Sequence, residues 1–423
     1  MGGGVVNVLQ RNAGEISRRA GRAIQITRAA TRDPKKLRIC PVGGIDLTTE
    51  PMQVVDDPEI QIVVELIGGI DPTRDLVLRA IAHGKHVVTA NKALIAIHGN
   101  EIFEAARRRG VMVAFEAAVA GGIPVIKTIR EGLSGNRIQW FAGIINGTGN
   151  FVLSEMRDKG REFAEVLAEA QKLGYAESDP TVDIDGTDAA HKLTILAAIA
   201  FGIPLQFDKV YIEGIDKVTR DDVFYAEQLG YRIKHLAIAR HTGNSIELRV
   251  HPTLIPERRL IANVESVMNA VLIRGDAVGP VLIYGAGAGA EPTASAVVAD
   301  LVDVVRALTS DPENRVPHLA FQPEALSDLS IAPMGDVETT YYLRMSAVDR
   351  PGVLADVTRI LGDLGISIEA VRQQEPLAGE THVPIVFLTH KIREWSMNDA
   401  IERIQSLESI RGTVTRIRLE MLA

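Results

Sequence analysis

The stretch "IQIVVELIGGIDPTRDLVLRAIAHGKHVVTANK" (residues 60–92) contains two apolar runs with a helical pattern between them. Residues 60–69 resemble a buried strand stopped by two glycines, and residues 85–92 a second strand. Residues 71–84 between them are typical of a helix, with Pro72 suited to its first turn and Gly84 to its end. A strand, a helix and a strand in this order indicate a βαβ unit in a mostly parallel sheet. We therefore predict an α/β fold in which ligands bind at the carboxyl ends of the strands.

The flanking sequence extends this pattern in both directions. Residues 23–33 and 111–122 are predicted strands, and residues 5–20 and 99–109 are predicted helices. Gly2 and Gly3 run directly into the first helix, as the end of a G-x-G-x-x-G phosphate loop would. We expect a Rossmann-like domain whose first strand is missing, and a native product with about a dozen more residues before Met1. An unstructured glycine-rich N-terminus is the other interpretation.

Two further positions are candidate dinucleotide contacts. Arg32 follows the second predicted strand, where NAD-specific sites usually carry an acidic residue that binds the ribose 2′-hydroxyl. An arginine there suits the 2′-phosphate of NADP, although a solvated loop charge explains it equally well. Gly68 ends the strand of residues 60–69 and is the second candidate.

Composition limits the class of protein. The chain has 423 residues, 46% of them apolar and 24% charged, which predicts two or three domains. A net charge of −8 argues against nucleic-acid binding and against an acidic membrane surface. The single cysteine, Cys40, allows no internal disulfide, and no apolar run is long enough to span a bilayer. We expect a cytoplasmic protein.

The segment "LGYAESDPTVDIDGTDAAHKLTILAAIA" (residues 173–200) contains the densest chemistry. A calcium loop centred on Gly186 is excluded, because its first and last ligand positions would be Thr181 and Lys192. From about residue 187 the pattern is helical, so Asp188 and Lys192 share one face at i,i+4. A surface ion pair is the ordinary interpretation of such a spacing. Here the pair begins a strongly apolar helix, where a buried ammonium could give a proton to a substrate oxygen.

Five motifs in order resemble the homoserine dehydrogenase family. They are "TANKALIA" (89–96), "FEAAVAGGIPVI" (115–126), "INGTGNFVLSEM" (145–156), "GYAESDPTVDIDGTDAAHKL" (174–193) and "YGAGAGAEPTASAV" (284–297). About the last 85 residues resemble an ACT domain. The resemblance implies reversible hydride transfer between NAD(P)H and L-aspartate 4-semialdehyde, which gives L-homoserine.

The resemblance also implies roles for individual residues. Lys192 matches the catalytic proton donor and Lys92 a second lysine at the hydride-transfer site, while Glu177 and Asp188 match homoserine-binding residues with Asp183 as a helper. Gly174 and Gly289 match backbone contacts to the nicotinamide cofactor, which would be NADP or NAD. The resemblance also implies a monovalent cation at Glu116, Val119, Gly121 and Ile123. The cation would be sodium, because these residues would offer the hard oxygen ligands that sodium prefers.

The predicted domain organisation follows the same resemblance. Residues 1–132 form the dinucleotide-binding domain, to which a helix at residues 290–310 returns, and residues 133–289 form an α+β substrate-binding and dimerisation domain. Its strands are expected to form a largely open-faced sheet, which suits a homodimer or homotetramer. A linker (309–333) precedes a βαββαβ ACT domain (335–423), in which Asp349, Pro351, Gly352 and Val353 would bind the effector L-threonine.

Two other functional classes remain open on the sequence alone. One is an oxidoreductase acting on another amino-acid semialdehyde, which the Asp188 and Lys192 motif disfavours. The other is an amino-acid sensor whose enzyme body is inactive, which the intact set of matched residues disfavours.

Overall fold

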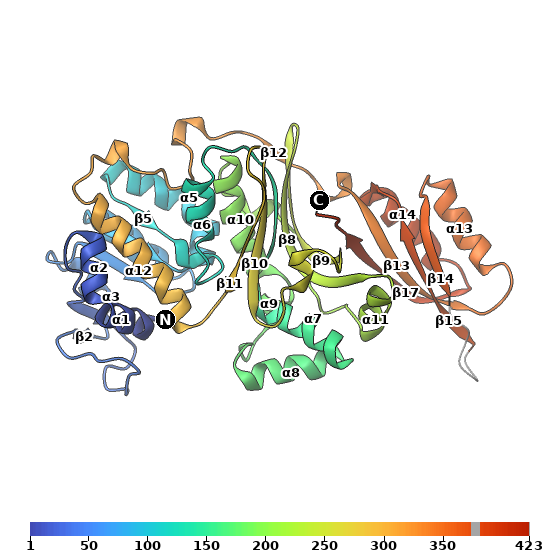
Figure 1. The fold of residues 1–423 in the computed structure, drawn as a ribbon, viewed down its shortest axis with the longest axis horizontal. Helices are drawn as coiled ribbons and strands as arrows, with labels where there is room; N and C mark the ends of the chain where they lie inside the picture. Colours follow the sequence, from blue (N-terminus) through green and yellow to red (C-terminus); the bar gives the residue numbers. More distant parts are fainter. Residues whose placement is uncertain (374–380, 423) are drawn as a thin grey trace.

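Three parts follow one another along the long axis of the molecule (Figure 1). The computed structural model describes residues 1–373 and 381–422. The N-terminal part contains α1 (Gly2–Arg11), α2 (Ala13–Ala20), β1 (Arg28–Ala30), β2 (Asp46–Thr48), α3 (Pro51–Asp56), β3 (Ile62–Glu65), α4 (Thr73–Ala82), β4 (His86–Thr89), α5 (Lys92–Arg109) and β5 (Val113–Ala114).

The middle part contains six α-helices and a long, mostly antiparallel sheet. Its elements are α6 (Val125–Lys127), β6 (Ile138–Ile144), α7 (Gly147–Lys159), α8 (Phe163–Leu173), α9 (Thr181–Ile184), α10 (Thr187–Phe201), β7 (Tyr211–Ile212), α11 (Arg220–Gln228), β8 (Tyr231–Thr242), β9 (Ser245–Pro256), β10 (Met268–Gly275) and β11 (Gly279–Ala286). The helix α12 (Ala290–Ala307) then returns to the N-terminal part (Figure 1).

The C-terminal part has the order β–α–β–β–α–β with one short additional strand. Its elements are β13 (Glu338–Val348), α13 (Val353–Asp363), β14 (Ile368–Gln373), β15 (His382–Thr389), β16 (Ile392–Arg393), α14 (Glu394–Gln405) and β17 (Ile410–Leu419).

The N-terminal part contains the predicted βαβ unit. Strands β3, β4 and β5 form a parallel sheet in that order, and β1 and β2 form a separate parallel pair. Helices α1 and α2 pack against α12 through apolar side chains such as Val5, Val8 and Leu9. The helices approach closely because residue 4 is glycine: a Cβ there would lie 2.4 Å from the carbonyl oxygen of Ala290.

The predicted strand at residues 111–122 is wrong beyond its first residues. Only Val113 and Ala114 pair with β4, and residues 116–118 form a 3₁₀ turn. The chain turns here because the carboxylate of Glu116 accepts the backbone N–H groups of Ile126 (2.9 Å) and Lys127 (2.8 Å). The apolar run is therefore buried as a loop and a helix start.

The expectation of an open-faced sheet is also wrong for β8 and β9. The middle sheet has the order β11-β10-β6-β8-β9, and α10 packs against β8 and β9. On the other face, Ile261, Val264 and Leu422 cover Leu236 and Ile255. At the β10–β11 edge the apolar surface is more open, and Tyr284 is 56% exposed there.

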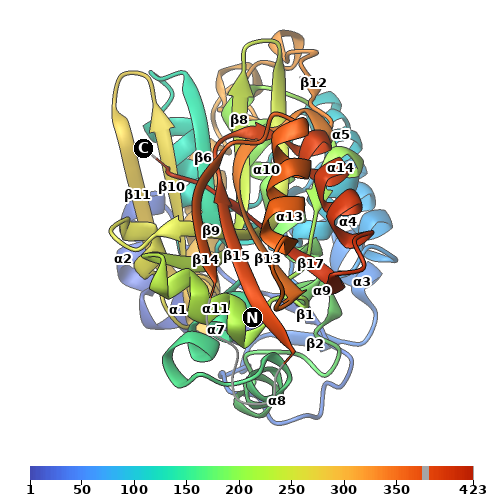
Figure 2. The same ribbon diagram turned by 90° about the vertical axis from the view of Figure 1, so that its right-hand side faces the viewer.

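The C-terminal part continues the middle sheet. Strand β17 pairs with β9 in parallel at Arg418↔Thr253 and Leu419↔Leu254, so among the described residues the middle and C-terminal parts share a sheet of 12 strands. From β9 the sheet continues in the order β17, β13, β15 and β14, and Figure 2 shows α13 and α14 in front of these C-terminal strands.

Residues 309–333 connect the parts along the surface. His318 stacks on Phe103 with ring centroids 4.8 Å apart, Phe321 lies against Gly202, and β12 (Ser330–Ile331) pairs with β9. Within residues 1–373 and 381–422, no helix has the length and apolar character needed to cross a bilayer.

Candidate active site

Two lysines from different parts of the chain meet on one carboxylate. The Nζ atom of Lys192 lies 2.6 Å from Asp188 Oδ2, and the Nζ atom of Lys92 lies 2.7 Å from Asp188 Oδ1. Lys92 is the first residue of α5 in the N-terminal part, whereas Asp188 and Lys192 lie in the first turns of α10 in the middle part. The predicted i,i+4 pair is therefore present, and the structure adds Lys92 to it.

The burial of these groups differs. The side chains of Asp188 and Lys192 are 4% and 11% exposed, whereas that of Lys92 is 41% exposed. Burial alone would raise the pKa of Asp188, but the two ammonium groups outweigh it and hold the pKa well below its usual range. Asp188 is therefore ionised at neutral pH.

The two lysines are shifted in opposite directions. Burial lowers the pKa of Lys192 below its ordinary value, although Asp188 counteracts the shift. Burial also acts to lower the pKa of Lys92, but attraction to Asp188 outweighs it and the pKa is raised. A lysine with a lowered pKa gives up its proton more readily, so Lys192 is the better acid of the two.

The residues that follow β6 organise this cluster. The carbonyl oxygen of Ile145 accepts a hydrogen bond from Lys192 Nζ at 2.7 Å. The side-chain Nδ2 of Asn146 donates to Asp183 Oδ1 and to Asp188 Oδ2, both at 2.8 Å. Asn146 was not among the residues that the sequence predicted for the site. Its position between a strand and a helix in "INGTGN" is the one sequence signal that could have pointed to it.

The start of α10 is fixed by a glycine. Gly186 has φ +93° and precedes the helix, and a Cβ on it would lie 3.1–3.2 Å from Ile212, His235 and Val250. A larger residue there would be strained and crowded. Gly186 thus places the first turn of α10, with Asp188, against the sheet.

The two other predicted substrate residues lie beside the cluster. Asp183 belongs to α9, and its pKa is raised because burial outweighs the hydrogen bond from Asn146. Glu177 is exposed, and its charge contributes to the raised pKa of Lys92. The structure therefore brings both carboxylates into the field of the lysines.

The predicted cofactor residues lie in several loops. Gly2 and Gly3 begin α1, and Gly3 faces Ile39 and Cys40 in the segment that follows Arg32, which is exposed. Gly174 ends α8 with φ +74°, and Gly289 precedes α12 with φ +118°.

Glu65 organises the loop of Gly68. Its Oε1 accepts the N–H groups of Ile67 (2.7 Å) and Gly68 (3.1 Å), and its Oε2 accepts the Thr89 hydroxyl (2.6 Å). Asn91, which caps α5, also donates to the carbonyl of Gly69 at 2.6 Å. The ends of β3 and β4 and the start of α5 are thereby tied together, a link that the sequence did not reveal.

The predicted cation residues form a buried loop. Ala120 and Gly121 have φ values of +54° and +53°, and a Cβ on Gly121 would lie 2.3 Å from the carbonyl oxygen of Gly287. Burial raises the pKa of Glu116 to about 7. Among the described residues, no three His, Cys, Asp or Glu side chains gather in a metal-binding group.

The predicted effector residues form the turn between β13 and α13. Asp349 and Pro351 are exposed, Gly352 has φ +95°, and Val353 begins the helix. No side chain in the described part of the chain caps the N–H groups at this helix start.

Comparisons with known proteins agree with this arrangement. Residues 1–116 match the family "Homoserine dehydrogenase, NAD binding domain", residues 124–302 match "Homoserine dehydrogenase", and residues 341–409 match "ACT domain". A homoserine dehydrogenase of Pseudomonas aeruginosa is 65% identical over 422 residues, which are 100% of this chain and 97% of that protein.

Solved structures support the same assignment. A homoserine dehydrogenase from Thiobacillus denitrificans has a TM-score of 0.94 at 65% identity, covering 100% of this chain and 96% of that chain. A hyperthermophilic archaeal homoserine dehydrogenase in complex with NADPH has a TM-score of 0.53 at 26% identity, covering 70% of this chain and 82% of that chain. The predicted fold class, with a Rossmann-like domain and a C-terminal ACT domain, is thus confirmed. The chain therefore belongs to the homoserine dehydrogenase family.

Proposed function

We propose that this chain catalyses the reversible, NAD(P)H-dependent reduction of L-aspartate 4-semialdehyde to L-homoserine. The observation that carries the proposal is the pair of lysines held by Asp188 between the dinucleotide-binding and middle parts. The bound dinucleotide supplies the hydride. The protein must then bind the amino acid, stabilise charge on the aldehyde oxygen and deliver one proton to it.

Lys192 is the proposed proton donor. Two of its three N–H groups are used by Ile145 and Asp188, which leaves one for the substrate oxygen. Negative charge develops on that oxygen during reduction, and a nearby ammonium stabilises it before the proton moves. Lys92 adds a second positive charge at the same place.

The carboxylates have a different proposed role. A homoserine molecule carries an ammonium group, which needs an anionic partner in the site. Asp183 and Glu177 would receive this ammonium, and Asp188 would orient the two lysines and contact the substrate.

The proposed cofactor site lies around the starts of α1 and α12. Gly2, Gly3, Gly68, Gly174 and Gly289 would bring bare backbone close to the dinucleotide. Arg32, which is exposed beyond β1, would bind the 2′-phosphate and favour NADP over NAD.

A sodium ion is proposed at the loop of residues 119–123. Val119 and Gly121 are buried, and in the described residues their carbonyl oxygens accept no hydrogen bond, which suits hard oxygen ligands. The Ile123 carbonyl accepts the Val125 N–H at 2.7 Å and has a second lone pair. Both Glu116 oxygens already bind backbone N–H groups, so Glu116 would bind sodium through its remaining lone pairs.

L-Threonine is the proposed effector of the ACT domain. Its carboxylate would bind the uncapped N–H groups at the start of α13, beside Asp349, Pro351, Gly352 and Val353. The enzyme would act in the cytoplasm, as expected for a chain with one unpaired cysteine.

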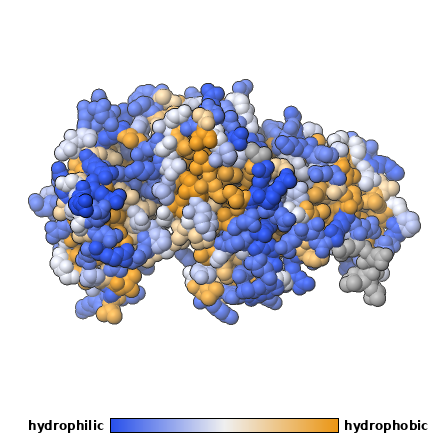
Figure 3. All heavy atoms as spheres, viewed as in Figure 1, coloured by the Kyte–Doolittle hydropathy of each residue, from blue (hydrophilic) through white to orange (hydrophobic). Residues whose placement is uncertain are grey.

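We also propose a homodimer or homotetramer. Trp140, Leu272 and Leu282 lie on one face of β6, β10 and β11, where they are only partly buried. Figure 3 shows an apolar surface in this central region. A second copy of the chain would cover this face.

The test is steady-state oxidation of homoserine with NADP and with NAD, each with and without threonine. Turnover of homoserine, but not of related hydroxy acids, supports the proposal. Absence of turnover together with threonine binding would favour the amino-acid sensor.

A further inference from the structure

Asn146 holds two substrate-site carboxylates with a single amide group. Its Nδ2 carries two hydrogens, and these bind Asp183 Oδ1 and Asp188 Oδ2. Its Oδ1 accepts the backbone N–H of Gly149 at 2.7 Å and caps α7. Asn146 is 6% exposed, so water does not compete strongly for these bonds.

The orientation of the amide is fixed by chemistry. A carboxylate accepts hydrogen bonds and a backbone N–H donates one, so a reversed amide would face both carboxylates with its oxygen. The reversed orientation would lose all three hydrogen bonds. Asn146 is thus locked with its donors toward the two acids.

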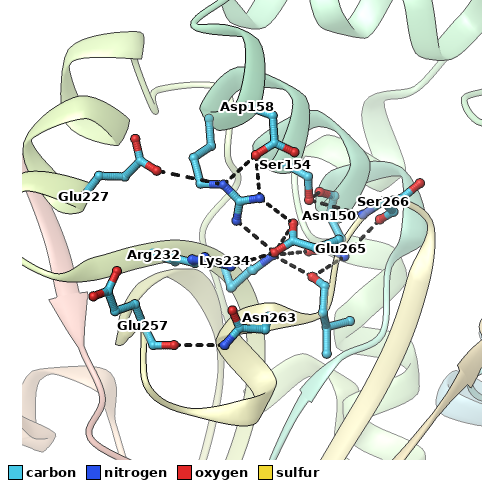
Figure 4. Close-up of polar contacts among 12 residues, drawn as sticks. Asn150, Ser154, Asp158, Glu227, Arg232, Lys234, Glu257, Asn263, Glu265 and Ser266 are labelled. Atoms are coloured by element: carbon cyan, nitrogen blue, oxygen red, sulfur yellow. Dashed lines mark hydrogen bonds and ion pairs between the residues drawn. The ribbon is translucent and has the colours of Figure 1, made fainter.

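The helix that carries Asn146 is also fixed. One turn later, Asn150 Nδ2 donates to the carbonyl oxygens of Val264, Ser266 and Met268, and Asn150 Oδ1 accepts from buried Lys234. Figure 4 shows Asn150, Lys234 and Glu265 converging at this helix. These hydrogen bonds hold the first turn of α7, and therefore Asn146, in place.

We propose that Asn146 is a positioning residue, which holds Asp183 beside Asp188 so that Asp183 can bind the substrate ammonium. Two carboxylates this close repel each other, and the shared amide hydrogens offset the repulsion. Only Oδ1 of Asp183 is used, and no donor in the described residues binds its Oδ2. That oxygen is available to a cationic group. The proposal deepens the proposed homoserine function and rests on it.

Other charges act on the same pair of acids. Lys92 and Lys192 act on both acids, and His191 on α10 and His235 on β8 lie in the field of Asp188, while Glu177 acts on Lys92 and Asp185 acts on the two histidines. In the described residues, Asn146 is the group that donates hydrogen bonds to both carboxylates. A change at residue 146 should therefore be visible in substrate binding and in its pH dependence.

Two variants separate positioning from capping. Asn146→Ser retains a side chain that caps helices well but lacks the bridging donors. Asn146→Asp is close in shape and also caps, but it places a third carboxylate among the acids. Asn136→Ser is the matched control, because Asn136 precedes β6 at the strand's other end and binds the carbonyl of Leu133 and the N–H of Val278 in the β10–β11 turn.

The measurements are kcat, KM for homoserine and for the dinucleotide, the pH profile of kcat/KM, and Tm. Asn146→Ser should raise the homoserine KM roughly tenfold or more, since a hydrogen bond to a charged group is lost. The dinucleotide KM should stay within about twofold. Asn146→Asp should move the acid limb of the profile upward by about one pH unit or more, because adjacent carboxylates hold a proton more tightly.

The outcomes distinguish the two proposals. If the wild-type enzyme does not oxidise homoserine, the proposed function fails. If it does, but Asn146→Ser keeps the wild-type homoserine KM and Asn146→Asp keeps the acid limb, the positioning role is wrong. Should Asn146→Ser fail to fold, the nearly isosteric Asn146→Asp decides. The Asn136→Ser variant should change neither parameter.

Discussion

Replacing Lys192 by Met is the most direct test of the proposed chemistry. Methionine has a similar length and fills the buried space, but it has no ammonium to bind Asp188 or the carbonyl of Ile145. A positioned general acid contributes roughly 10²–10⁴-fold to a rate, which corresponds to about 3–5 kcal/mol of transition-state free energy. We expect kcat for aldehyde reduction to fall by at least the lower of these factors.

The variant should still fold. Removing one partner of a buried ion pair usually costs about 3–5 kcal/mol because a charge is left alone. Asp188 would keep Lys92 at 2.7 Å and Asn146 at 2.8 Å, so we expect a smaller loss of unfolding free energy.

The assay follows consumption of reduced nicotinamide with L-aspartate 4-semialdehyde at saturation. Binding of the reduced dinucleotide, measured separately by fluorescence, should be unchanged. Lys209→Met is the control, because the Lys209 side chain is 60% exposed and forms an ion pair with exposed Asp208. A Lys192→Met enzyme within threefold of the wild-type kcat would refute the assignment.

Four other changes test the remaining proposals. Because burial lowers the pKa of Lys192 from 10.5, aldehyde reduction should decline as the pH rises through a value below 10.5, where the ammonium is lost; a profile flat to that pH would contradict the role. Arg32→Ala should raise the KM for NADP about tenfold while that for NAD changes little, and equal changes would exclude a 2′-phosphate contact. Gly352→Val, at φ +95°, should raise the threonine midpoint at least about fivefold with kcat unchanged, and an unchanged midpoint would place the effector elsewhere. Deleting residues 335–423 should give little soluble protein, because buried Arg249 loses Glu420 and β9 loses β17, one of its partner strands; a soluble truncated enzyme with wild-type Tm would contradict this.

The local sequence pattern was sufficient to predict the βαβ unit and the ion pair of Asp188 with Lys192. Residues 60–92 carry their own start and stop signals, and the structure has β3, α4 and β4 within them. Asp188 and Lys192 are four residues apart in a helix, so their contact follows from helix geometry.

The local sequence pattern could not predict contacts between distant segments of the chain. Asn146 contacts Asp183 and Asp188, which are 37 and 42 residues away in the sequence. The periodicity of apolar residues does not predict contacts at such separations. Lys92 entered the predicted site only through the family resemblance, since it reaches Asp188 from another part of the molecule.

Burial by distant residues also explains the wrong expectations. Alternation in β8 and β9 suggested an exposed face, but residues such as Ile261 and Leu422 cover it. An apolar run at residues 111–122 suggested a strand, whereas Glu116 turns the chain by capping the next helix. In both places the sequence indicated that residues are buried, but it did not indicate which distant residues cover them.

The pairing of β17 with β9 has a consequence for how the protein is made. Buried Arg249 forms an ion pair with Glu420, which is 171 residues further along the chain. At a translation rate of about 5–20 residues per second, the arginine is synthesised roughly ten to thirty seconds before its partner. During that interval Arg249 has Glu247 but lacks Glu420, and β9 lacks its partner strand at Thr253 and Leu254. The C-terminal domain therefore completes the sheet of the middle part, and that sheet is finished only when the last strand of the chain has been synthesised.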